Sequence, residues 1–157
     1  MHSNDVELQF YEAGHLERLQ AFRLPEQQEQ FTALPVGMLE KTGERHPIVI
    51  MGRNEPVGFF VLHSGEKVKE YAENPNAMLL SAFSIDYAEQ GKGYAKKGMG
   101  LLKRFVNRQF AKCDEIVLAV NRGNIPAQKL YEKAGFTDTG RRRTGPNGEQ
   151  LVMSLAV

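Results

Sequence analysis

A glycine-rich turn set between an apolar run and a helical pattern constrains the fold of this chain more than any other feature. The apolar run at Met78–Ile85 is typical of a strand, and from about Tyr94 to Phe110 the apolar residues recur at helical spacing. Glu115–Val120 is then a nearly continuous apolar run, as expected for a strand buried on both faces. This strand, helix, strand order predicts an α/β domain.

The remaining elements extend this unit on both sides. Pro25 and Pro35 limit two short early helices, and a later helix is predicted to have Asn124 as its N-cap and to end before Gly135. Gly98 and Gly100 interrupt the long helix, and close packing on the sheet is the expected reason. Further strands are predicted at Val6–Phe10, Ile48–Met51, Val57–His63, Phe136–Arg142 and Leu151–Val157. We expect one domain spanning residues 1–157, with a mixed sheet flanked by helices.

Composition excludes several classes of function. The chain of 157 residues has a formal net charge of +1, which favours neither nucleic acid nor membrane as a partner. Its only cysteine, Cys113, allows no intrachain disulfide, which fits a cytoplasmic protein. No signal pattern or membrane-length apolar run is present, and the four histidines lack metal-ligand spacing. The basic segment Arg141–Arg143 could contact RNA, but a solvated turn is the preferred interpretation.

The glycine-rich turn carries lysines where a helix prefers negative charge. Lys92, Lys96 and Lys97 lie at the helix start, the positive end of the helix dipole. Gly91 and Gly93 would expose backbone N–H groups there, so a bound anion such as a phosphate would make these lysines favourable. The turn is no Walker loop, because Asp86 occupies the position of its first glycine. It also lacks the last small residue of the dinucleotide fingerprint.

Two motifs together resemble the GNAT family of N-acetyltransferases. The first is Gln90-Gly91-Lys92-Gly93-Tyr94-Ala95, which is similar to the family's Q/R-x-x-G-x-G/A signature. The second, Asn124–Phe136, is similar to the family segment N-x-x-A-x-x-L-Y-x-K-x-G-F and follows the buried strand as it does in that family. The resemblance covers about Met78 to Phe136. It implies a single-domain GNAT-like fold with a mostly antiparallel sheet, and acetyl-CoA as co-substrate without a metal.

The family resemblance also implies where the co-substrate binds. Two strands, Met78–Ile85 and Glu115–Val120, would splay apart and hold the pantetheine arm between their main chains. The diphosphate would lie on the glycine loop. The residues implied are Phe83, Ile85, Gln90, Gly91, Lys92, Gly93, Tyr94, Ala95 and Asn124.

Direct acetyl transfer needs a neutral amine, a polarised carbonyl and a proton for the leaving thiolate. A backbone N–H of the strand ending at Ile85 could stabilise the oxyanion. Tyr131 is expected to face inward from its helix, and its phenol could protonate the thiolate. No general base is assigned. Asp86 is expected only to cap a turn, and Glu40 and Glu44 lie in the early region, where the family match is loose.

The acceptor is the least constrained part of the prediction. The early region faintly resembles bacterial polyamine acetyltransferases, and Glu29 and Glu40 could line a groove that attracts a small-molecule amine. A solvated helix face explains these carboxylates equally well, and protein N-termini and antibiotic amines stay open as acceptors. The alternatives to an enzyme are a coenzyme A-binding sensor and, more distantly, an RNA-binding module. Either a monomer or a homodimer is compatible with the sequence.

Overall fold

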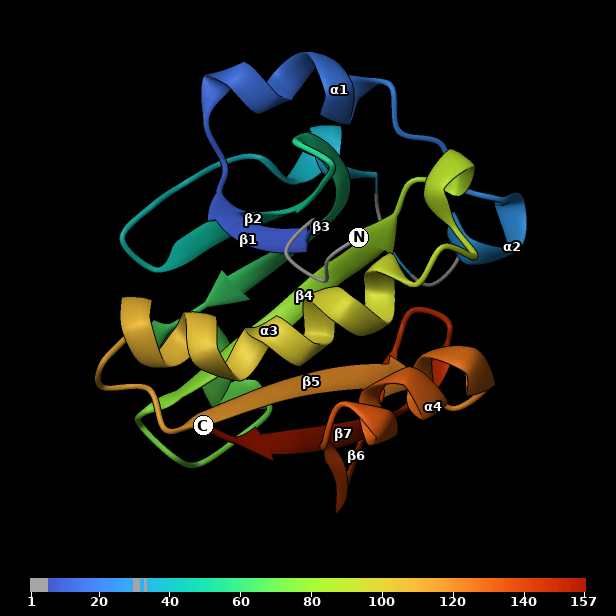
Figure 1. Cartoon of the computed structure of the whole chain (residues 1–157). Helices are drawn as coiled ribbons and strands as arrows, with labels where there is room; N and C mark the ends of the chain where they lie inside the picture. The colour runs from blue at the N-terminus through green and yellow to red at the C-terminus, as the bar shows by residue number, and fades with distance from the viewer. Residues whose placement is uncertain (1–5, 30–31, 33) are drawn as a thin grey trace.

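The computed structural model describes residues 6–29, 32 and 34–157. A single sheet of seven strands in the order β1-β2-β3-β4-β5-β7-β6 runs through the molecule (Figure 1). Every neighbouring pair is antiparallel except β4 with β5, so the predicted mixed and mostly antiparallel sheet is confirmed. The strands are β1 (Val6–Phe10), β2 (Arg45–Gly52), β3 (Glu55–His63), β4 (Ala77–Ile85), β5 (Glu115–Asn121), β6 (Thr137–Gly145) and β7 (Gly148–Ala156).

Helices cover both faces of this sheet. The described helices are α1 (Leu16–Gln20), α2 (Glu26–Glu29), α3 (Tyr94–Gln109) and α4 (Ile125–Lys133). Short 3₁₀ turns, which the sequence did not indicate, occur at Ala13–His15, Pro35–Met38, Gly65–Glu70 and Tyr87–Glu89. A helix was predicted between Pro25 and Pro35. Among the described residues of this segment, only α2 is α-helical, and residues 30, 31 and 33 lie outside the described residues.

The two faces of the sheet have separate cores. Helices α3 and α4 lie together on one face (Figure 1), where Leu102 and Tyr131 pack against Ile48, Phe60 and Ile116. On the other face, α1 contributes Leu19 to a cluster centred on the β2 and β3 side chains. A smaller cluster on this second face joins the turn at Gly65–Glu70 to the beginnings of β4 and β5.

Strands β4 and β5 part after a short paired segment. Their parallel pairing covers only Ala77–Leu79 against Glu115–Val117. Beyond it, β4 stays paired with β3 as far as Ile85, and β5 stays paired with β7. The predicted splay is therefore present, and it leaves the facing main-chain edges of both strands without a neighbouring strand.

A β-bulge distorts β4 inside this open segment. Phe60 of β3 lies opposite two residues of β4, Ala82 and Phe83, and Ala82 has a φ of 56°. A left-handed alanine is strained, and such bulges are common beside active sites because they redirect side chains. Here Ala82 packs on the α1 face, whereas Phe83 packs on the α3 face.

The two glycines in α3 have different surroundings. A Cβ on Gly98 would lie 3.1 Å from Cδ1 of Ile50, so the expected close packing on the sheet is confirmed there. For Gly100 the expectation is wrong, because no described atom lies within 4 Å of such a Cβ. The helix turns Gly100 toward solvent.

Replacing Gly100 by Ala is therefore expected to stabilise the fold. The gain is about 0.8–1 kcal/mol from helix propensity, which corresponds to a rise in Tm of about 2–4 °C in a chain of this size. Gly98→Ala is the matched control, and its Cβ would crowd Ile50, so no gain is expected. Thermal unfolding of both variants measures the difference, and a Tm for Gly100→Ala at or below that of the parent would contradict the assignment.

Candidate functional site

A cavity of about 1000 Å³ occupies the opening between β4 and β5. The cavity extends to the first turn of α3, to Gln28 in α2 and to Thr32. Its walls come from residues 80–85 of β4, 89–91 and 93–96 of the glycine loop and α3, 118–121 of β5, the start of α4 with Tyr131, and the β6–β7 turn. The two sequence motifs thus line one continuous space.

The glycine loop presents backbone donors to this cavity. Gly91 and Gly93 have φ values of 82° and 87°, and a Cβ on either would meet no described atom within 4 Å. Gly93 is the N-cap of α3, and the first bond inside the helix is donated by the N–H of Lys97 to the carbonyl of Gly93, at 3.0 Å. The preceding N–H groups of the first turn have no partner in the helix, no side chain caps them, and no acidic residue occurs in that turn. Such a terminus binds anions.

The lysines of the loop have different roles. Lys92 forms an ion pair with Glu89 at 3.1 Å, and its side chain does not line the cavity. Lys96, which the sequence-based list of cofactor residues did not include, does line it. An anion at the α3 terminus would therefore meet Lys96 rather than Lys92.

Gln90 positions the loop through its side chain. Its Nε2 donates to the carbonyl oxygen of Ile85 at 2.9 Å and to Oε1 of Gln28 at 2.9 Å. Gln28 Nε2 in turn donates to Oε1 of Gln90 at 3.2 Å. Although Gln90 borders the cavity, its amide already joins the loop to β4 and to α2.

Asp86 makes a second connection of the same kind. Its Oδ2 pairs with Nη2 of Arg18 at 2.8 Å, and its Oδ1 accepts from the N–H of Arg23 at 2.9 Å. Asp86 is the N-cap residue of the 3₁₀ turn at Tyr87–Glu89, as expected, and its carbonyl accepts from the N–H of Glu89 at 2.8 Å, but its side chain makes no capping bond there. Asp86 instead holds the segment that follows α1 against the end of β4.

Tyr94 is a core residue that also borders the cavity. Its ring lies against the backbone of Gly52 in β2, where a Cβ would be 2.6 Å from Cε1 of the ring. This contact fixes the first turn of α3 on the sheet. Ala95, the next residue, lines the cavity.

The main chain of β4 faces the cavity at Ile85. The N–H of Asp86 donates to the carbonyl of Val57 at 3.0 Å, and Ile85 is in register with Gly58. Because backbone groups alternate in direction along a strand, those of Ile85 point away from β3. Its carbonyl accepts from Gln90, and its N–H is directed into the opening beside β5.

Tyr131 lies in the wall on the α4 side. Its side chain is 7% exposed, and its ring packs edge-on against Phe83 and Phe136, with centroids 6.1 and 5.7 Å away. Its hydroxyl forms no hydrogen bond with the described residues. Burial raises the pKa of this phenol, so it stays protonated through neutral and alkaline pH. A protonated, unpartnered phenol in a cavity wall can act as a proton donor.

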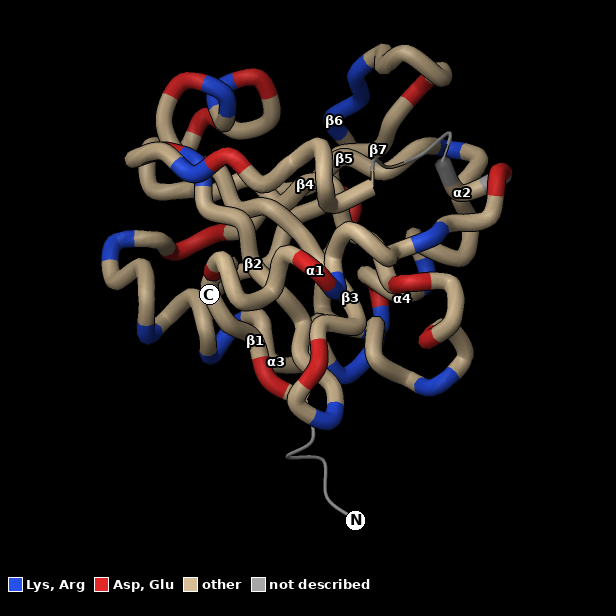
Figure 2. Tube along the Cα trace, turned by 90° about the horizontal axis from the view of Figure 1, so that it is seen from above, with Lys and Arg blue, Asp and Glu red and all other residues tan. Residues whose placement is uncertain are grey.

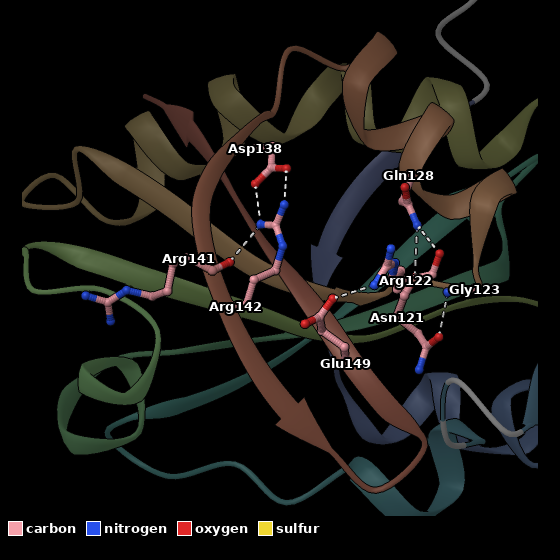
Figure 3. A network of polar contacts seen from close by, with 8 residues as sticks. All are labelled: Asn121, Arg122, Gly123, Gln128, Asp138, Arg141, Arg142 and Glu149. Carbon is pink, nitrogen blue, oxygen red and sulfur yellow. Dashed lines mark hydrogen bonds and ion pairs between the residues drawn. The ribbon is translucent and has the colours of Figure 1, made fainter.

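The start of α4 is fixed by side-chain bonds to the preceding loop. Oδ1 of Asn124 accepts from the N–H of Ala127 at 3.3 Å, which confirms its predicted capping role. Gln128 Nε2 donates to the carbonyls of Asn121 and Arg122, and the N–H of Gly123 donates to Oδ1 of Asn121 (Figure 3). Asn124 is also in the cavity wall. Its side-chain nitrogen, Nδ2, has no hydrogen-bond partner in the described part of the chain.

The cavity beside α2 is lined by hydroxyl groups. The Oγ atoms of Ser84 and Thr32 are buried and lack a hydrogen-bond partner among the described residues. Buried polar groups are nearly always satisfied, so these two hydroxyls indicate the position of a ligand or ordered water. Glu40 is exposed and outside the cavity wall, and the side chain of Glu29 lies outside the described residues.

A buried pair of side chains was missed by sequence reasoning. His63, at the end of β3, lies 2.6 Å through Nε2 from Oγ of Ser81 in the cavity wall. Burial, assisted by Arg45 and Lys67, lowers the pKa of His63 to about 4. The available signal was a histidine at the end of an apolar strand, but no local pattern links it to Ser81, which is 18 residues away in the sequence.

The basic segment of β6 is neutralised by neighbouring carboxylates. Arg142 holds Asp138 through two bonds of 2.8 and 2.9 Å (Figure 3). Arg141 and Arg143 face Glu73 and Glu70 at 4.0 and 3.5 Å. Figure 2 shows both signs of charge interspersed over the chain trace. Arg141 and Arg142 lie in the strand predicted at Phe136–Arg142, and β6 continues through Arg143, which was expected in a turn.

Two further kinds of site were sought among the described residues. No group of three or more His, Cys, Asp or Glu side chains able to hold a metal ion occurs there. No helix in the same residues is long and apolar enough to cross a membrane.

Comparisons with known proteins agree with this geometry. The family model of the acetyltransferase (GNAT) family matches residues 9–136. A Bacillus subtilis protein described as "uncharacterized N-acetyltransferase YbbJ" is 49% identical over 155 residues, covering 96% of this chain and 97% of that protein. A spermine/spermidine N(1)-acetyltransferase of the same organism is 31% identical over 121 residues, covering 73% and 75%.

Solved structures show the same fold. An aminoglycoside acetyltransferase in complex with coenzyme A and kanamycin superposes with a TM-score of 0.77 at 20% identity, over 96% of this chain and 94% of that chain. A ribosomal L7/L12 α-N-protein acetyltransferase in complex with coenzyme A gives 0.73 at 15% identity, over 98% and 94%. The chain thus belongs to the acetyltransferase (GNAT) family and is an N-acetyltransferase that uses acetyl-CoA as its acetyl donor.

Proposed function

We propose that this chain transfers the acetyl group of acetyl-CoA directly to a primary amine of a small molecule. One observation carries the proposal: a single cavity joins the uncapped start of α3, the open edges of β4 and β5, Tyr131 and the buried hydroxyls of Thr32 and Ser84. A diphosphate, an extended thioester arm and an amine each have suitable groups along this space. The splayed strands supply backbone groups that only a ligand can satisfy.

Each part of the cavity has a role in this proposal. The N–H groups of Gly93, Tyr94 and Ala95 hold the diphosphate, and Lys96 adds positive charge. The main chain of β4 near Phe83 and Ile85 bonds the thioester arm, and a backbone N–H there stabilises the oxyanion. Tyr131 gives its proton to the departing thiolate. Burial raises the pKa of a phenol and of a thiol alike, so the proton transfer stays feasible in the closed cavity.

Polyamines are the first acceptors to test. A relative that is 31% identical is named for spermine and spermidine, and Gln28, Thr32 and Ser84 offer oxygen atoms to the N–H groups of such a chain. The carboxylate of Glu89 also borders the cavity, although Arg18 and Lys92 already pair with it at 3.6 and 3.1 Å. Glu29 remains a candidate for attracting a polycation because it neighbours Gln28 in α2.

The test is release of coenzyme A thiol in the presence of a panel of amines. The panel contains spermine, spermidine, an amino alcohol, kanamycin and a peptide with a free N-terminus, each at the same concentration of acetyl-CoA. We expect turnover with a small primary amine and mass-spectrometric detection of its N-acetyl product. Turnover with the peptide and with none of the small amines would indicate that the acceptor is a protein N-terminus rather than a small molecule. Tight coenzyme A binding without turnover on any amine would favour the sensor instead.

A further inference from the structure

The His63–Ser81 pair lies on the acceptor side of the sheet. Nε2 of His63 and Oγ of Ser81 are 2.6 Å apart, and His63 is 4% exposed. His63 is in register with Leu79, so it shares a face with Leu79 and with Ser81 two residues further along β4. Val61 of β3 is in register with Ser81. Both Val61 and Leu79 belong to hydrophobic clusters on the face of the sheet opposite α3 and α4. The pair therefore lies across the sheet from Tyr131.

Ser81 is also placed at the mouth of the opening between the strands. Leu79 is the last residue of β4 paired with β5, and Ser81 is the next residue on the same face. The bulge at Ala82 follows directly. Ser81 lines the cavity, whereas His63 lies behind it, so a ligand in the opening can meet the serine hydroxyl and reach the imidazole only through it.

We propose that Ser81 and His63 form the proton relay that deprotonates the acceptor amine, with Ser81 in contact with the amine and His63 as the final proton acceptor. The proposal rests on the proposed function. It supplies a general base for the reaction. Glu89 is the carboxylate in the described cavity wall, and it is already paired with Arg18 and Lys92.

The relay balances the proton transfers of the reaction. The amine nitrogen forms a bond to the acetyl carbon, and the carbonyl electron pair moves to oxygen. The nitrogen gives a proton to Oγ of Ser81 while the serine proton moves to Nε2 of His63. The carbon–sulfur bond then breaks, the carbonyl re-forms, and the thiolate takes the proton of Tyr131. Return of the His63 proton to solvent and reprotonation of Tyr131 restore the protein.

The charges around His63 keep its imidazole free of a proton before the reaction, and they also make it a weaker base than an unperturbed histidine. Burial lowers the pKa of His63 most, and the charges of Arg45, Lys67 and His46 lower it further, so the imidazole is uncharged at neutral pH. An uncharged imidazole with its proton on Nδ1 has a lone pair on Nε2 that can accept the serine proton. The negative charge that develops on the acetyl oxygen raises the proton affinity of nearby groups as the amine loses its proton.

The test compares His63→Gln, Ser81→Ala and the double variant in steady-state kinetics across pH. Glutamine places an amide nitrogen near the position of Nε2 and can still bond Ser81, but it cannot take up a proton. We expect kcat to fall about 100-fold in each single variant, with acetyl-CoA affinity unchanged by calorimetry. The double variant should lose little more, because the two residues act as a unit. The loss should shrink at high pH, where hydroxide from solvent can accept the amine proton in place of His63.

Ser84→Ala is the comparison variant, since Ser84 lines the same cavity on β4 without contacting His63. We expect it to raise the KM for the amine and to leave the shape of the pH profile as in the parent. His63→Gln with the parental kcat and pH profile would overturn the relay and leave a structural hydrogen bond, while acetyl transfer itself stands. Absence of turnover by the parent on every amine would overturn the relay and the proposed function together.

Discussion

Replacing Tyr131 by Phe is expected to lower kcat about 100-fold, within the range found for loss of a general acid. Acetyl-CoA affinity should stay close to that of the parent, because the ring keeps its contacts with Phe83 and Phe136. Stability should not fall either, since the hydroxyl has no partner among the described residues that its removal would leave unsatisfied. Stopped-flow or steady-state thiol release, with calorimetry for binding, separates the two effects.

The matched control for this experiment is Tyr71→Phe. Tyr71 packs beside Val68 and Ala77 and does not line the cavity, so removal of its hydroxyl tests the general cost of losing a phenol. We expect kcat within about twofold of the parent for this variant, as is usual for changes away from a site. A Tyr131→Phe enzyme as fast as the parent at every pH would exclude Tyr131 as the acid, and the proton of the thiolate would then come from water.

Gly93→Val is expected to weaken acetyl-CoA binding by at least about tenfold. Gly93 has a φ of 87°, and the left-handed region costs a residue with a Cβ about 1–2 kcal/mol. A branched side chain there would also extend over the backbone N–H groups at the start of α3, which line the cavity. Calorimetric titration with coenzyme A gives the dissociation constant, and thermal unfolding reports the strain separately.

Two variants make the Gly93 result specific. Gly93→Asn is compatible with a left-handed conformation and has no branch at Cβ, so its affinity should lie between those of the parent and of Gly93→Val. Gly100→Ala alters a glycine in the same helix outside the cavity and should bind coenzyme A as the parent does. Parental affinity in Gly93→Val would show that the diphosphate does not lie on this loop.

Features that depend only on residues close together in the sequence could be predicted from it. The bounds of β1, the start of α3 at Tyr94 and the Asn124 cap all agree with the structure. Periodicity, capping and turn chemistry are local, so a few consecutive residues decide them. The inward direction of Tyr131 is of this kind, because its position on α4 fixes the face from which the ring projects.

The tertiary structure alone decided which distant residues meet. Gln28 joins Gln90, Asp86 joins Arg18 and Arg23, and His63 joins Ser81, all across separations that no local pattern encodes. The fold also left Lys96 at the cavity, whereas the ion pair of Lys92 with Glu89 is a local contact between residues three apart.

Local sequence patterns were enough to predict the seven strands, the two longer helices, the glycine-rich turn before α3 and the inward-facing Tyr131. The fold decided where β4 leaves β5, because that point depends on strand register and on the packing of two cores against one sheet. Register and packing are cooperative properties of strands that lie far apart along the chain, so the opening between β4 and β5 and the contact of His63 with Ser81 could not be predicted from local patterns.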